Sequence, residues 1–164
     1  MTTKRVYGWM PDLPDNRDLV YSAPRPIMAV ELPTFVDLRP GCSKVEHQGN
    51  IGSCVANAIV SMMEFLEIQA TKTWVDMSRL FLYYEARAMI FSTAFDGGSR
   101  IRDGIKVLSK IGVPHESDWP YVESKWKIKP DAAAYREAKK HIVSSYQRLD
   151  SLHDMRSCLA EGFP

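Results

Sequence analysis

Apolar residues recur at helical spacing from position 54 onward, which predicts the first long helix of the chain. The residues that set this period are Val55, Ile59, Met62, Met63 and Leu66. Gly49 and Gly52 interrupt the chain before the helix, and Ser53 then suits the N-cap position. Cys54 is therefore expected in the first helical turn.

Two more helices are predicted in the middle of the chain. The first spans about 79–90 with Ser78 or Asp76 at its N-cap, and its apolar residues lie on nearly every side, which indicates a buried helix. The second follows the run Asp96-Gly97-Gly98-Ser99 and stops at Gly112. Its predicted apolar face consists of Ile101, Ile105, Leu108 and Ile111.

The last part of the chain predicts two helices separated by an extended segment. A helix over 131–141 is expected to direct Ala132, Tyr135 and Ala138 inward, and residues 142–149 follow as a strand with weak alternation. Ser151 and Asp154 then have the spacing of a capping box for a final helix that ends at Gly162. The apolar ending after this helix favours the N-terminal part of a longer chain.

Residues 1–31 are predicted to form a proline-rich arm, and residues 32–164 the folded domain. Six of the ten prolines lie within the first 40 positions. Each proline fixes its own φ and lacks an N–H donor, so an extended path over the surface is expected. Two interpretations stay open: an arm that only lies on the surface, or a pro-segment that covers a functional groove.

Composition excludes several classes of protein. A chain of 164 residues with 45% hydrophobic and 25% charged residues matches one globular domain with an appended segment. Lys and Arg number 21 against 20 Asp and Glu, and this net charge of +1 favours no nucleic-acid partner. No long apolar run is present, so neither a membrane helix nor a Sec-type signal peptide is expected. A cytoplasmic, reducing compartment is the default, with export by a non-Sec route left open.

The cysteines and histidines do not suggest a disulfide framework or a metal centre. Cys42, Cys54 and Cys158 are too few for a framework, and a bridge between Cys42 and Cys158 stays open. No C-x-x-C pair and no two histidines four positions apart occur. We therefore expect no metal and no other cofactor.

Cys54 is the strongest candidate for chemistry. A cysteine in the first turn of a helix lies at the positive end of the helix dipole, which favours its thiolate. Gln48 lies six positions upstream and offers an amide N–H₂ that can donate to a developing oxyanion. The alternative for a lone cysteine on a helix is a small core residue, so the assignment depends on its neighbours.

Two segments resemble the start of a papain-like cysteine peptidase domain. They are Leu32-Pro-Thr-Phe-Val-Asp-Leu-Arg39 and Val45-Glu-His-Gln-Gly-Asn-Ile-Gly-Ser-Cys54. The resemblance implies an α+β papain-like fold whose helical half is complete and whose β-barrel-like half is truncated. It implies Cys54 as nucleophile and Gln48 as oxyanion donor. Gly52, Gly97 and Gly98 would line the substrate groove, where bound peptides pair through their main chain. The short N-terminal segment is similar to that of the family's bacterial branch.

The departures from the family pattern concern the partners of the cysteine. Ile51 stands where secreted relatives have a disulfide cysteine, and Val55 replaces an aromatic residue. None of the four histidines of this chain matches the catalytic position of the family. The resemblance therefore implies that the catalytic His and Asn lie beyond residue 164, and that the chain alone is inactive.

The resemblance implies a cysteine endopeptidase that acts through an acyl-enzyme on peptide or protein substrates. Its own arm over the cleft is the second expected partner, and a monomer without a membrane partner is expected. Two alternatives stay open. One is a non-catalytic peptide-binding papain-like module, and the other is an acyl transferase of the transglutaminase type.

Overall fold

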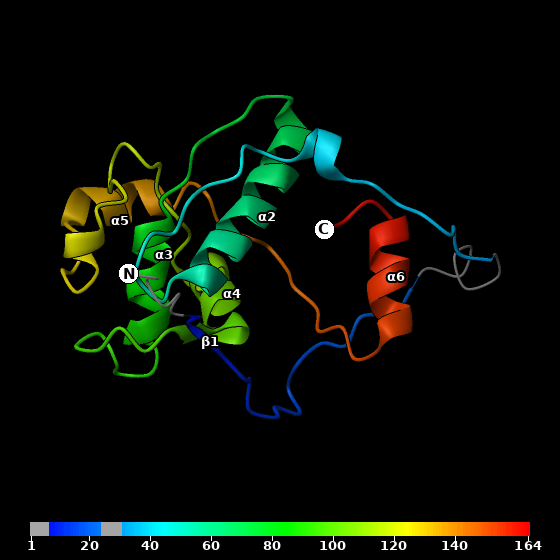
Figure 1. The fold of residues 1–164 in the computed structure, drawn as a ribbon, viewed down its shortest axis with the longest axis horizontal. Coiled ribbons are helices and arrows are strands. Elements are labelled where there is room, and N and C mark those ends of the chain that lie inside the picture. Colours follow the sequence, from blue (N-terminus) through cyan, green and yellow to red (C-terminus); the bar gives the residue numbers. More distant parts are fainter. Residues whose placement is uncertain (1–6, 24–30) are drawn as a thin grey trace, which may run out of the picture.

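The computed structural model describes residues 7–23 and 31–164, and its core is a group of three helices. α2 (Cys54–Thr71), α3 (Arg79–Ala88) and α4 (Ile101–Lys110) pack on one another (Figure 1). Fully buried side chains between them include Val60, Leu80, Leu82, Val107 and Leu108. Burial of such aliphatic side chains stabilises a fold by about 1.5–3 kcal/mol each.

Short elements surround this core. β1 (Trp9–Met10) pairs in parallel with β2 (Ser99–Arg100), and the 3₁₀ turns are η1 (Arg39–Gly41) and η2 (Glu123–Lys125). α5 (Ala132–Ala138) packs beside α3, whereas α6 (Leu152–Ala160) stands apart from the three-helix group (Figure 1). None of the helices in the described ranges is long and apolar enough to cross a membrane.

The caps confirm several predicted helix boundaries. The Ser78 side chain accepts a hydrogen bond from the Phe81 N–H, so Ser78 is the N-cap of α3. Ser151 and Asp154 form the capping box at the start of α6. Ser53 precedes α2 as predicted, but its side chain makes no capping hydrogen bond. Its hydroxyl instead lies 2.5 Å from the Tyr121 hydroxyl.

The predicted face of α4 is partly wrong. Its fully buried positions are Val107 and Leu108, whereas Ile101 is 47% exposed. The reason is Gly104, where an added Cβ would lie 2.4 Å from the Ile59 side chain. This glycine lets α4 approach α2 closely and turns the neighbouring isoleucines toward a cavity.

Two predictions for the last part of the chain are also wrong. Residues 142–149 form no strand and make a single parallel bridge, between Val20 and Arg148. Ala132 is exposed and Ala134 is the buried alanine in its place. Ala138 is buried as predicted, and Tyr135 packs edge-on against Phe81 with the ring centroids 5.2 Å apart. The helix is shorter than predicted.

Candidate active site

Cys54 is the first residue of α2, and its side chain reaches an open cavity. The residue is half-buried, while Val55 and Ala56, the next two residues, are buried in the core. The cavity has a volume of about 720 Å³ and is lined by Cys54 together with Trp9 of the arm and Ile101 of α4. Cys54 therefore packs against the edge of the core and also lines this cavity, so it is not fully enclosed.

The backbone N–H of Cys54 is available as a donor. The first N–H groups of a helix have no intrahelical acceptor, and the Cys54 N–H makes no hydrogen bond within the described part of the chain. The turn before it is fixed, because the Ser53 N–H donates to the Ile51 carbonyl at 2.9 Å. The first turn of α2 therefore presents a thiol and an unpaired N–H from one residue.

Gln48 lies on the loop that leads into α2 and is held at both ends. Its Nε2 donates to the Ile51 carbonyl at 2.9 Å, and its backbone carbonyl accepts from the Tyr121 hydroxyl at 2.8 Å. A carboxamide nitrogen carries two hydrogens, and the bond to Ile51 uses one of them. The second remains for another acceptor.

A buried network behind the site joins the two glycine segments. The Asp96 carboxylate accepts from the Gly52 N–H at 2.9 Å and from the Tyr83 hydroxyl, and that hydroxyl accepts from the Gly98 N–H at 3.3 Å. Burial and the hydrogen bond to Asp96 raise the pKa of Tyr83 well above its usual value, so the phenol stays protonated and donates. Tyr83 and Asp96 thus set the separation between Gly52 and Gly98.

The main chain of the N-terminal arm lies between these glycine segments. The Gly8 carbonyl accepts from the Ser99 N–H at 2.8 Å. A Cβ at Gly98 would lie 1.8 Å from the Gly8 carbonyl oxygen, and a Cβ at Gly8 would lie 1.8 Å from the Gly52 carbonyl oxygen. Three glycines therefore allow the main chain of the arm to lie between Gly52 and Gly98, whereas Gly97 faces open space.

Charged groups anchor the arm further along. The Arg102 guanidinium of α4 pairs with the Asp18 carboxylate, and both side chains are largely buried. The backbone N–H of Arg102 also donates to the Asp12 carboxylate at 3.1 Å. A desolvated Arg–carboxylate pair is stronger than a surface pair, so this contact fixes the arm against α4. Of the predicted arm, residues 1–6 and 24–30 lie outside the described residues.

No histidine lines the Cys54 cavity within the part of the chain that the structure describes. His47 is exposed, and its Nδ1 accepts from the Gly49 N–H at 3.0 Å. His153 is exposed on α6, and His115 and His141 lie together at another place. Cys42 and Cys158 are free thiols.

Sequence reasoning named Cys54, Gln48, Gly52, Gly97 and Gly98 as candidates. The structure places Gly52 and Gly98 close to Gly8 of the arm, and a Cβ at Gly97 would contact nothing there. Sequence reasoning missed Ser99, whose N–H donates to the Gly8 carbonyl of the arm. Tyr83, Asp96 and Tyr121 were also missed as positioning residues, although Asp96 directly precedes the glycine pair.

Comparison with known proteins agrees with this geometry. No family model matches the chain. An uncharacterized peptidase C1-like protein of Acanthamoeba polyphaga mimivirus is 33% identical over 189 residues, which cover 99% of this chain and 60% of the relative. The crystal structure of xylellain, a cysteine protease from Xylella fastidiosa, is 34% identical and superposes with a TM-score of 0.90 over 99% of this chain and 66% of that one.

The chain belongs to the papain-like cysteine peptidase family. It spans 60% and 66% of the lengths of these two relatives. A procathepsin L 3 from the larval midgut of Tenebrio molitor shares the papain-like fold, at 17% identity and a TM-score of 0.69 over 96% of this chain. The α+β fold with a helical half is thereby confirmed.

Proposed function

We propose that this chain carries the nucleophile and the oxyanion donors of a cysteine endopeptidase, with Cys54 as the attacking thiolate. The observation that carries the proposal is the position of Cys54. It opens α2, lines an open cavity and lies two residues after Gly52, which the main chain of the arm approaches closely at Gly8. A core cysteine would have none of these properties.

The reaction follows from the groups around the sulfur. The Cys54 thiolate attacks the carbonyl carbon of the scissile peptide bond, and the negative charge moves to the carbonyl oxygen. The Cys54 N–H and the second hydrogen of Gln48 Nε2 would stabilise that charge. The C–N bond then breaks, the amine leaves with a proton, and water hydrolyses the thioester to release the acid and regenerate the thiolate.

The substrate groove is proposed to be the one formed by Gly52, Gly97 and Gly98. The pairing of Gly8 with Ser99 supports main-chain recognition, because any peptide has the carbonyl that the Ser99 N–H binds. A substrate strand and the arm would compete for the same space. We therefore propose that the arm of residues 1–31 is a pro-segment that blocks the groove.

The proton donor to the leaving amine would be a histidine, oriented by an asparagine, in a part of the protein beyond these 164 residues. None of the histidines described above lines the cavity of Cys54. Without an imidazolium partner the helix dipole favours the thiolate by only about 0.3–1 kcal/mol, so this chain alone should show little turnover.

The test uses the protein encoded by the complete reading frame, supplied with a fluorogenic peptide with and without a primary amine acceptor. We expect a histidine and then an asparagine in the sequence past Pro164, and hydrolysis that Cys54→Ala abolishes and Cys42→Ser preserves. Cys42 is the matched control, because it lines the same cavity but lies outside the helix. Peptide binding without cleavage, or transfer to the amine in place of hydrolysis, would overturn the proposal.

A further inference from the structure

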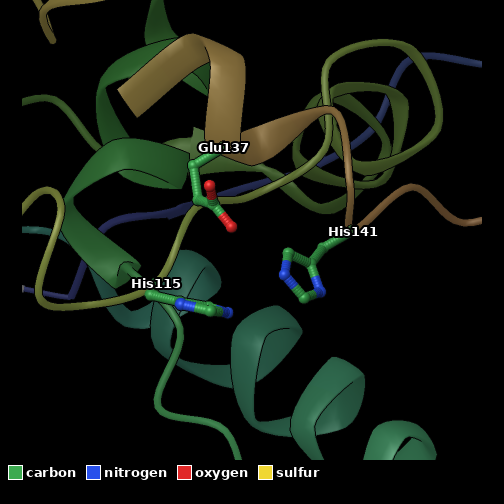
Figure 2. Close-up of side chains that lie close together, drawn as sticks. All are labelled: His115, Glu137 and His141. Carbon is green, nitrogen blue, oxygen red and sulfur yellow. The ribbon is translucent and has the colours of Figure 1, made fainter. Parts of the chain in front are cut away.

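A second group of side chains with ligand chemistry lies apart from the Cys54 cavity. His115, Glu137 and His141 converge, with the Glu137 carboxylate pointing between the two imidazole rings (Figure 2). One potential ligand atom from each of the three residues lies within 4.8 Å of the other two. All three residues are half-buried, and none of them lines the Cys54 cavity.

Backbone contacts hold the three residues in place. His115 bridges to Met77 beside α3, and the Val113 N–H donates to the His141 carbonyl at 3.3 Å. Gly112 has φ +83°, and a Cβ there would lie 1.9 Å from the Ala138 carbonyl oxygen. This glycine lets the chain after α4 approach the end of α5. The ligand atoms are therefore brought together by the fold itself, which lowers the ordering cost of binding an ion.

The donor set suits a borderline-soft divalent ion. Two imidazole nitrogens and one carboxylate oxygen are ligands that Zn²⁺ accepts, with a fourth position left for water. The ring centroids of His115 and His141 are 4.8 Å apart, and neither ring makes a hydrogen bond within the described segments. Burial and the neighbouring His115 lower the pKa of His141, which favours the neutral ring that binds metals.

Nearby charges act in opposite directions. The Lys140 ammonium lies 2.7 Å from one Glu137 carboxylate oxygen and competes with a cation, but its side chain is 67% exposed and can turn away. Glu67 on α2 stabilises positive charge at His141. An incoming cation would thus displace an exposed ion pair and gain the attraction of Glu67.

We propose that His115, Glu137 and His141 form a binding site for a divalent transition-metal ion of the Zn²⁺ class. The ion would join α5 to the turn that follows α4, with water as its remaining ligand. This site is independent of the chemistry proposed for Cys54. Sequence reasoning missed it because it searched for two histidines four positions apart, whereas Glu137 and His141 have that spacing and His115 joins them only through the fold.

The test is a titration of the chain, without an affinity tag and with all three cysteines replaced by serine, with ZnCl₂ and with CoCl₂. Removing the thiols eliminates their own metal binding, and circular dichroism checks the fold of each variant. We expect one Zn²⁺ per chain, a raised Tm and the visible absorption of Co²⁺ in a low-coordinate site. His115→Ala and His141→Ala should each weaken binding by about 100-fold, since loss of even outer-shell partners costs 10–100-fold.

Two further variants separate metal binding from a structural role. Glu137→Gln should weaken binding, whereas Lys140→Ala should tighten it because the competing ammonium is removed. His153→Ala is the matched control, since it removes an exposed histidine elsewhere. A dissociation constant above about 1 mM would overturn the proposal. So would His115→Ala or His141→Ala variants that bind Zn²⁺ as tightly as the unsubstituted histidine site, or a His153→Ala variant that loses as much affinity as they do.

Discussion

At the scale of single residues, Cys54 would supply both the nucleophile and one oxyanion donor of the proposed reaction. Its sulfur is the nucleophile, and its own N–H is a donor for the oxygen that becomes charged. Both groups are available for the same reason, which is that α2 begins at this residue. One turn into the helix this no longer holds, because the Asn57 N–H already donates to the Ser53 carbonyl at 3.0 Å.

Gln48→Ala tests the second oxyanion donor. We predict that kcat of the complete enzyme falls by about 10²–10³, the usual cost of losing one such donor, with little change in KM. Gln147→Ala removes an exposed glutamine as a control and should leave kcat unchanged. Steady-state kinetics on one peptide substrate decides the matter, and a Gln48→Ala enzyme with unaltered kcat would remove Gln48 from the mechanism.

The residues that sequence reasoning identified and those it missed differ in a physical way. Cys54, Gln48 and Gly52 lie within seven positions of one another, so a local motif contains them. Asp96 and Tyr121 act on the same turn from 44 and 68 positions away. No local period records such contacts, because they exist only once α3, the loop that follows it and the loop after α4 have packed.

At the scale of elements, the helices were predictable and their exact limits less so. Apolar residues recur at helical spacing because one side of each helix is buried. The core of α2, α3 and α4 confirms this, since it consists of such residues. α2 ends at Lys72, which has φ +60°. Glycine or asparagine usually takes this left-handed conformation at a helix end, so the sequence contains no signal that predicts this boundary. The segment 142–149 forms no strand and makes one bridge, from Arg148 to Val20, because the arm beside it is not a strand there.

Gly8→Ala tests whether the arm covers the groove. The added methyl would lie 1.8 Å from the Gly52 carbonyl oxygen, so the arm must shift away from Cys54. Overpacking of this kind costs about 1–3 kcal/mol, and we predict that iodoacetamide alkylates Cys54 about tenfold faster in this variant. Leu13→Ala, at an exposed arm side chain, is the control and should keep the original rate. An alkylation rate that Gly8→Ala leaves unchanged would argue against a covering arm.

At the scale of the whole molecule, the arm joins parts that otherwise lie apart. From β1 the arm continues past α4, where Arg102 pairs with Asp18. It then runs toward α6 (Figure 1). There Val20 bridges to Arg148, and the Tyr21 hydroxyl donates to the Glu161 carboxylate. If the arm is the proposed pro-segment, substrate entry would need the contact at Gly8 to break, while the later contacts could keep the arm attached.

The most direct measurement is to trap an acyl group on the protein. The product of the complete reading frame is mixed with an activated peptidyl ester, quenched in acid within the first turnover and mapped by mass spectrometry. We predict one acyl thioester, on the peptide that contains Cys54, which disappears on further incubation in water and is absent in Cys54→Ala. No acyl adduct, or an adduct on Cys42 or Cys158 in place of Cys54, would contradict a nucleophile at the start of α2.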